Sequence, residues 1–147
     1  MPALTVASPL GPVTLHETGG VLVRLTWGER AADRSPLMDL AAAQLDDWFA
    51  GRRGGFDLPL DWGSGLHAQV RRAMADIPRG ETRTYGAIAR AIGAPAQAVG
   101  QACGANPLPL LIRCHRVTGT NWLGGFSAPG GVETKASLLQ MEGALLI

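Results

Sequence analysis

Hydrophobic and polar residues alternate along the first part of the chain, from residue 3 to residue 27. Successive side chains of a β-strand point to opposite faces, so a period of two is typical of strands with one buried face. The alternation breaks at residues 9–12, and again at Gly19–Gly20, a pair that favours a tight hairpin turn. The pattern therefore predicts a small antiparallel sheet, and we expect His16 to serve that sheet rather than a catalytic site.

A helical period replaces the alternation after residue 34. Ser35 is a good N-cap, and Pro36 suits the first turn of a helix. The apolar positions that follow form one face of the predicted helix: Leu37, Leu40, Ala41, Leu45, Trp48 and Phe49. Three aspartates fall on the other face. We expect this helix to cover the sheet with its apolar side and to expose its acids to solvent.

Four further helices are predicted in the second half of the chain. One covers residues 64–77, where a serine begins it and a proline ends it, and the last covers residues 132–142 and is followed by a glycine. Between them lie a short helix within residues 82–93 and a second helix over about residues 96–104. Two helices joined by a three-residue Gly/Pro turn match the spacing of a helix-turn-helix.

The second helix of this pair has an unusual composition, because it contains Gly100 and Gly104. Each glycine costs about 1 kcal/mol relative to alanine in a helix interior. Close approach of the helix backbone to a neighbour would offset this cost. That neighbour is either another helix or the narrow minor groove of a nucleic acid.

These elements predict an α/β fold, with an N-terminal antiparallel sheet and one covering helix, followed by a mainly helical domain with a helix-turn-helix. We place a boundary in the extended connector between residues 55 and 64, which gives an N-terminal subdomain over residues 1–60. Residues 61–147 then form the domain that carries the candidate site. A chain of 147 residues with 46% hydrophobic residues is large enough to bury a core of this kind.

Composition excludes several classes of protein. Two cysteines make no disulfide framework, and Cys103 and Cys114 lack the Cys/His partners of a zinc site, so we expect reduced thiols and no metal. The N-terminal residues do not resemble a signal peptide, and no apolar run reaches the roughly 18 residues of a membrane span. We therefore expect a cytoplasmic protein with no membrane partner.

The net charge of +1 does not by itself indicate a nucleic-acid-binding protein, but the charge is unevenly distributed. Residues 1–51 hold three arginines against six acids, whereas residues 52–135 hold nine arginines and one lysine against five acids. Arginine forks onto phosphate better than lysine does. The second part of the chain would therefore be the part that faces a polyanion.

The candidate chemistry centres on Cys114, which follows an apolar run and lies between Arg113 and His115-Arg116. The thiolate is the nucleophilic form of cysteine, nearby positive charge lowers the thiol pKa, and a histidine can take the proton. The alternative is a buried structural cysteine. We favour a reactive thiol, because charged side chains are rarely buried without partners. Such a thiolate could attack an acyl carbon, a disulfide or a saturated carbon.

Residues 106–117 resemble the active-site signature of the O6-alkylguanine-DNA alkyltransferases, also called methylated-DNA–protein-cysteine methyltransferases. That signature reads Asn-Pro-x-Pro-x-x-x-Pro-Cys-His-Arg-Val, and residues 78–86 and 96–100 are similar to the same family. The resemblance extends over essentially the whole chain. It implies single-turnover, irreversible transfer of the alkyl group of O6-alkylguanine in duplex DNA to the protein's own cysteine, with O4-alkylthymine as a second candidate substrate.

The resemblance also implies roles for individual residues. Cys114 would be the nucleophile, with His115 and Glu142 relaying its proton through a water, in the manner of a hydrolase triad. Asn106 would brace the turn that carries the cysteine, and the Tyr85 hydroxyl would donate to N3 of the guanine. A helix-end carboxylate in solvent is the alternative for the acid, and a core ring is the alternative for the tyrosine.

Substrate and DNA contacts follow from the same resemblance. It implies that the protein is a monomer and needs no cofactor. It also implies that the protein binds double-stranded DNA through the minor groove and flips the target nucleotide. Pro109 would form one wall of the pocket for the alkyl group. Backbone groups at residues 114 and 117 would accept hydrogen bonds from the guanine amino group, and the backbone amide of residue 127 would donate a hydrogen bond to O6. The full set of expected binding residues is Thr84, Ala96, Gln97, Ala98, Gly100, Pro109, Arg113, Arg116, Val117, Phe126 and Ser127. For Arg116, a phosphate contact and structural pairing are both open.

The chain departs from the family pattern at a few positions. Gln97 replaces an arginine that fills the space of the flipped base, and it lacks that residue's charge and planar stacking. Arg113 replaces the proline before the cysteine, which restores an N–H group and backbone freedom; its charge could lower the Cys114 pKa or contact a phosphate. Phe126 stands where tyrosine is common, in a loop over residues 124–131 with two extra residues.

Two other functions are compatible with these residues. One is a non-catalytic alkyltransferase-like lesion-binding protein or a diverged paralogue with weakened DNA binding, although such proteins lack the cysteine. The other is a cysteine enzyme that acts on a small acyl or alkyl substrate without DNA. Salt-dependent DNA binding would separate the second from the rest.

Overall fold

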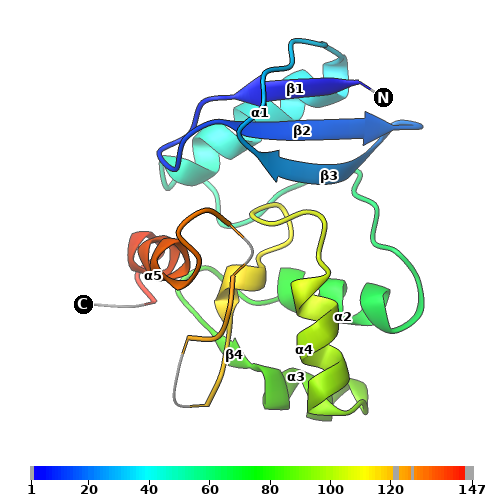
Figure 1. Ribbon diagram of the computed structural model, residues 1–147, viewed down its shortest axis with the longest axis vertical. Helices are drawn as coiled ribbons and strands as arrows, with labels where there is room; N and C mark the ends of the chain where they lie inside the picture. The colour runs from blue at the N-terminus through cyan, green and yellow to red at the C-terminus, as the bar shows by residue number, and fades with distance from the viewer. Residues whose placement is uncertain (1, 121–122, 127, 145–147) are drawn as a thin grey trace. The chain divides into compact units, whose positions relative to one another are not determined.

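The structure, a computed structural model, describes residues 2–120, 123–126 and 128–144. The chain divides into two compact units, Met1–Asp61 and Trp62–Ile147. The first contains a three-stranded antiparallel sheet and one helix, and the second is mainly helical (Figure 1). This confirms the predicted fold class. Within the described ranges, no helix has both the length and the apolar character needed to cross a bilayer.

The sheet of the first unit has the order β1-β2-β3, with strands Ala3–Val6, Val13–Thr18 and Val21–Trp27. The predicted hairpin is confirmed: Gly19 and Gly20 both have positive φ, which a tight two-residue turn requires. The inward side chains of the sheet are fully or almost fully buried, namely Val13, Leu15, Leu22 and Leu25.

Helix α1 (Pro36–Phe49) begins where the sequence predicts, and the Ser35 side chain accepts a hydrogen bond from the Met38 N–H. Its buried face differs from the predicted one. Leu40 is 48% exposed, whereas Met38 and Gln44 are buried. Gln44 is buried because its side-chain amide exchanges two hydrogen bonds with the backbone of Asp57, at 2.9 and 3.1 Å, and so fixes the connector that follows the helix.

The second unit begins with α2 (Gly65–Ala75), whose N-cap position is Ser64, although the serine side chain makes no capping hydrogen bond. The predicted helix pair is confirmed as α3 (Tyr85–Ile92) and α4 (Ala96–Gly104), joined through Gly93 in the left-handed conformation. The last helix, α5 (Val132–Met141), is capped by Glu142.

A short parallel pair of strands, β4 (Arg83–Thr84) and β5 (Val117–Thr118), is not predicted by the sequence pattern. Strand β4 runs directly into α3, and β5 directly follows the 3₁₀ turn η1 (Cys114–Arg116). The pairing therefore holds Tyr85, the first residue of α3, close to the turn that contains Cys114. Fully buried side chains of residues 108–117 build much of the core around this turn: Leu108, Leu110, Leu111, Ile112 and Val117.

Candidate active site

Cys114 is delivered by a tight, hydrogen-bonded turn. Arg113 has φ −78° and ψ 66°, and the Cys114 N–H donates to the Ile112 carbonyl at 2.8 Å, which is the geometry of an inverse γ-turn. The same carbonyl accepts a second hydrogen bond from Asn106 Nδ2 at 3.0 Å, and Asn106 Oδ1 accepts from the Leu108 N–H at 3.1 Å. The asparagine side chain thus closes the loop that leads to the cysteine.

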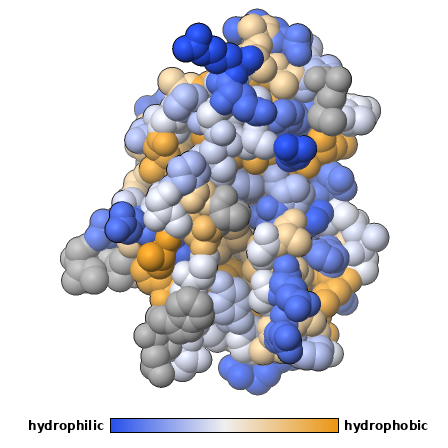
Figure 2. All heavy atoms as spheres, viewed as in Figure 1, coloured by the Kyte–Doolittle hydropathy of each residue, from blue (hydrophilic) through white to orange (hydrophobic). Residues whose placement is uncertain are grey.

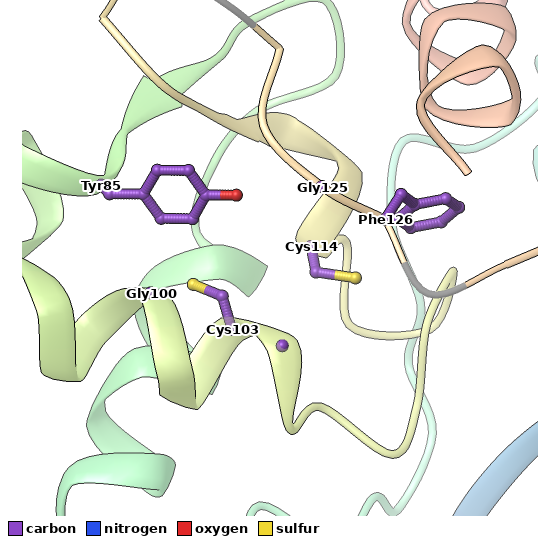
Figure 3. Close-up of a pocket in the computed structure, with 7 residues that line it drawn as sticks. Tyr85, Gly100, Cys103, Cys114, Gly125 and Phe126 are labelled. Carbon is purple, nitrogen blue, oxygen red and sulfur yellow. The ribbon is translucent and has the colours of Figure 1, made fainter.

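A cavity of about 300 Å³ opens beside the cysteine. Its walls come from four parts of the second unit: the start of α3, the face of α4, the turn η1, and the loop before α5 (Figure 3). The lining residues are Tyr85, Gly100, Cys103, Gly104, Cys114, Gly125 and Phe126. The tyrosine hydroxyl points toward the side of the cavity where Cys114 lies (Figure 3). Most of these residues are small, so the cavity is open largely because α4 contributes so little side-chain volume to it.

Cys114 is buried, with 9% of the residue exposed, and burial raises the pKa of its thiol. The expectation of a lowered pKa beside the flanking arginines is wrong, because the net shift of this pKa is upward. The opposing influences are hydrogen bonding to the Asn106 side chain, the positive charge of Lys135, and the N–H groups at the start of η1. The resting side chain is therefore a thiol that needs a base, within a setting that favours the thiolate once the proton has left.

His115 and Glu142 form a buried pair. Nε2 of the imidazole lies 2.8 Å from Oε1 of the carboxylate, and both side chains are completely enclosed. Arg116 completes the cluster, because its Nε lies 3.0 and 3.1 Å from the two carboxylate oxygens and its Nη2 also donates to Oε2. The alternative of a solvent-exposed acid at the end of α5 is therefore wrong.

The protonation states of this cluster follow from its contacts. Burial alone would raise the pKa of Glu142, but hydrogen bonds from His115 and Arg116 outweigh it and hold the pKa at about 2. Burial lowers the pKa of His115, and the nearby charges of Arg116 and Arg113 lower it further, against the opposing effect of Glu142. The imidazole is therefore neutral. Because a carboxylate can only accept, Nε2 carries the ring proton and Nδ1 is the basic nitrogen.

Arg113 and Arg116 do not lie where DNA-contacting residues would lie, which corrects the expectation of phosphate contacts and, for Arg116, favours structural pairing. Arg113 is 6% exposed and donates to the carbonyls of Leu111 and Ala75, while Arg116 is 1% exposed and donates to Ile77 O at 2.7 Å as well as to the carboxylate. Both guanidinium groups point into the protein. A phosphate contact would require their removal from these carbonyls, so we assign both to the fold of the active-site turn.

Lys135 is a residue of this site that the sequence interpretation missed. It lies on α5 with no exposed surface, and its ammonium group donates to the carbonyls of Val117 and Gly125, the latter at 3.2 Å. The nitrogen also lies 5.8 Å from the centre of the Tyr85 ring. A signal existed in the sequence, because this is the single lysine of the chain and it stands on the apolar side of an amphipathic helix.

The remaining expected binding residues have varied positions. Gln97 and Ala96 are exposed and Ala98 is half-buried on α4, while Gly100 and Phe126 line the cavity. Pro109 is buried but is not among the described cavity-lining residues, and Val117 is fully buried, its carbonyl already accepting from the lysine on α5.

Two more of the expected binding residues need separate mention. The side chain of Thr84 caps α3, where its Oγ1 accepts from the Ala87 N–H at 3.0 Å. Ser127 lies outside the residues that the structure describes. No three histidine, cysteine or acidic side chains gather into a metal-binding group within the described part of the chain.

Comparisons with known proteins agree with this geometry. Residues 65–144 match the family model described as the DNA binding domain of 6-O-methylguanine DNA methyltransferase. The methylated-DNA–protein-cysteine methyltransferase of Mycobacterium tuberculosis is 41% identical over 150 residues, covering 94% of this chain and 90% of that protein. The constitutive enzyme of that name from Bacillus subtilis is 37% identical over 153 residues, covering 94% of this chain and 93% of that protein.

Solved structures extend the similarity to three dimensions. The crystal structure of Mycobacterium tuberculosis OGT in complex with DNA has a TM-score of 0.86 and 39% sequence identity, and the match covers 98% of this chain and 94% of that one. Similarity of this extent, in sequence and in structure, shows that the chain belongs to the methylated-DNA–protein-cysteine methyltransferase family.

Proposed function

We propose that this protein repairs O6-alkylguanine in duplex DNA by transferring the alkyl group to Cys114. The observation that carries the proposal is the placement of the Cys114 thiol on the wall of an open cavity, next in sequence to a buried imidazole–carboxylate pair. In the reaction, the sulfur–carbon bond forms as the bond between the alkyl carbon and O6 breaks. The thiol loses one proton and the departing guanine gains one, so the products are a thioether and a normal guanine.

The proton would leave Cys114 through His115. The neutral imidazole can accept it at Nδ1, through an intervening water, because Nε2 is already committed to Glu142. Glu142 then faces an imidazolium, whose charge its carboxylate stabilises. The sulfur anion is stabilised by the ammonium of Lys135 and by the N–H groups at the start of η1. These groups are fixed before the reaction, so they cost little reorganisation when charge develops.

The leaving base would be stabilised from the opposite wall of the cavity. Burial raises the pKa of the Tyr85 hydroxyl, so this group stays protonated and can donate a hydrogen bond to N3 of the guanine. The loop with Gly125 and Phe126 would cover the base, and the Phe126 ring already lies edge-on to the imidazole of His115, with ring centres 6.4 Å apart. O4-alkylthymine is a second candidate substrate for the same cavity.

DNA would bind along α4 of the helix-turn-helix. Hydrophilic side chains gather over this helix (Figure 2). Two of its residues, Gln97 and Gln101, are exposed. A methyl group added at Gly100 or Gly104 would have no neighbouring atom within 4 Å among the described residues, so packing against those residues does not require these glycines. A helix with small side chains can approach a minor groove closely, and Gln97 would fill the space left by the extruded nucleotide. We expect a monomer in the cytoplasm to perform this reaction.

Intact-protein mass spectrometry with a duplex that contains one O6-methylguanine tests the proposal. We expect one methyl group per protein molecule, mapped to Cys114, and no gain for Cys114→Ser or for a duplex with unmodified guanine. Unmodified protein that binds the lesion duplex tightly would instead indicate lesion sensing. Unmodified protein without any affinity for DNA would indicate a cysteine enzyme for another substrate.

A further inference from the structure

The residue before the nucleophile is held in place by its own side chain. Arg113 is the central residue of the inverse γ-turn, and its guanidinium group folds back over the chain. Nη1 donates to the carbonyl of Leu111, two residues earlier, and Nη2 donates at 2.7 Å to the carbonyl of Ala75. Ala75 is the last residue of α2, so this side chain joins the turn of Cys114 to the end of a helix 38 positions away in sequence.

The end of α2 is a favourable place for such an attachment. The last carbonyls of a helix lack partners within the helix and carry the negative end of its dipole, so they bind cations well. Arg116 uses the same region, because its Nη1 donates to Ile77 O at 2.7 Å. The two arginines on either side of Cys114 therefore attach the turn to the last residue of α2 and to the residue two positions beyond it, and Asn106 restrains the turn through the Ile112 carbonyl.

We propose that Arg113 is a positioning residue, whose guanidinium group ties the Cys114 turn to the end of α2 and thereby directs the thiol into the cavity. This inference rests on the proposed alkyl transfer. The backbone at this position has φ −78°, within the range that a proline ring would impose. A proline would restrict the turn through its ring, whereas this chain restricts it through two hydrogen bonds from a charged donor, which are stronger than neutral ones.

Two substitutions separate this role from a general structural one. Arg113→Ala removes the tether and leaves φ unrestrained, and Arg113→Pro removes the tether but restores a restraint on φ. We expect the alanine variant to transfer methyl about tenfold more slowly at saturating duplex, since small misplacements of a nucleophile have effects of this size or larger. DNA affinity should stay unchanged. The proline variant should recover most of the rate, and Arg34→Ala, an exposed arginine of the first unit, serves as the charge-matched control.

A lysine variant makes the design robust if the alanine variant does not fold. Arg113→Lys keeps the charge but cannot reach two carbonyls with one planar fork, so we expect it to be slower than Arg113→Pro. If Arg113 had only a structural role, the lysine variant, which keeps the charge, should react faster than the proline variant. The tether is refuted if the alanine variant reacts at the wild-type rate, if its loss lies wholly in DNA affinity, or if the proline variant is no faster than the lysine variant.

A DNA-free measurement keeps this inference distinct from the proposed function. Iodoacetamide also reacts by displacement at a saturated carbon, and peptide mapping reports its reaction at Cys114 separately from Cys103. We expect the same order of rates: wild type, then the proline variant, then the lysine and alanine variants. If wild-type protein gains no methyl from the lesion duplex, the proposed function fails, while the order of carboxamidomethylation still supports or overturns the tether.

Discussion

Replacing Glu142 by glutamine tests the buried cluster most directly, because glutamine keeps the shape of the side chain and removes its charge. The carboxylate accepts hydrogen bonds from His115 and from two nitrogens of Arg116, and an oxygen lies 4.0 Å from a nitrogen of Arg79. A glutamine offers one accepting oxygen, and its amide N–H₂ faces these donors. The variant therefore removes the buried negative charge that Arg116 contacts.

The expected loss of stability follows from the burial of the pair. Both side chains have 1% or less exposed surface, and removal of one partner from such an ion pair typically costs about 3–5 kcal/mol. The second unit has the size of a small domain, for which 1 kcal/mol shifts the melting temperature by roughly 4–8 °C. We expect Glu142→Gln to lower the melting temperature of this unit by at least about 10 °C at neutral pH.

The effect should depend on pH in a defined direction. The folded-state pKa of Glu142 is held at about 2, below its ordinary value of 4.5. The wild-type protein therefore has the full benefit of the carboxylate above pH 4.5 and loses it as the pH falls toward 2, because the unfolded chain binds the proton first. The variant has no such group, so the difference in stability between the two proteins should shrink over the same interval.

Thermal unfolding monitored by circular dichroism from pH 7 to pH 3 measures both effects. Glu133→Gln is the matched control, because that glutamate lies exposed in the first turn of the same helix, where its loss should cost less than about 1 kcal/mol. The reasoning is wrong if Glu142→Gln melts close to the wild type at neutral pH, or if the gap between them is the same at every pH.

Three further predictions concern the cavity. Burial lowers the pKa of Lys135 to about 8, so above pH 8 the lysine loses its charge and no longer stabilises the thiolate in the wild-type protein. Lys135→Met should be slower than the wild type and should show no such step in a pH–rate profile. Burial raises the pKa of both thiols, that of Cys103 to about 12, but Cys114 is the one with His115 as its proposed base, so peptide mapping after reaction at pH 8 should find the alkyl group on Cys114 and an unmodified thiol at Cys103. Gly124→Ala should slow transfer, because the added methyl would lie 2.7 Å from the tyrosine hydroxyl that faces the cavity. Gly93→Ala is the control, because Gly93 also has a positive φ but a methyl there would meet no described atom within 4 Å. In single-turnover assays this control should retain the wild-type rate.

Local sequence signals predicted most of the fold because each element depends on a few neighbouring residues. The Gly19–Gly20 hairpin, the Ser35 N-cap and the Gly93 turn all follow from backbone chemistry within a few positions. The β4–β5 pair did not follow, since two-residue strands that meet across more than thirty positions leave no period to detect. The prediction for the buried face of α1 was partly wrong. Gln44 is buried because its side chain bonds to the backbone of Asp57, and a pattern of hydrophobic residues cannot indicate such a contact.

In the candidate site, too, some features follow from neighbouring residues in the sequence and others depend on packing. Neighbouring residues in the motif identified Cys114 and His115, and the resemblance supplied Glu142 as a partner. The prediction for the cysteine pKa was wrong, because it assumed that cations adjacent in sequence also lie adjacent in space. The arginines beside the cysteine point into the protein, and the ammonium group that acts on the thiol comes from α5. Which cation faces a thiol depends on packing, which adjacency in the sequence does not determine.

The burial of so much positive charge has a consequence for DNA binding. Four of the ten basic residues between positions 52 and 135 are buried in the protein, namely Arg71, Arg113, Arg116 and Lys135. Association with DNA weakens with ionic strength in proportion to the number of phosphates neutralised, with a logarithmic slope of about −0.9 for each. With these cations unable to displace counterions, the salt dependence should be shallow. In the proposed complex, affinity would then depend more on contacts of α4 with the groove and on stacking of the extruded base, so binding to damaged DNA should persist as the salt concentration rises.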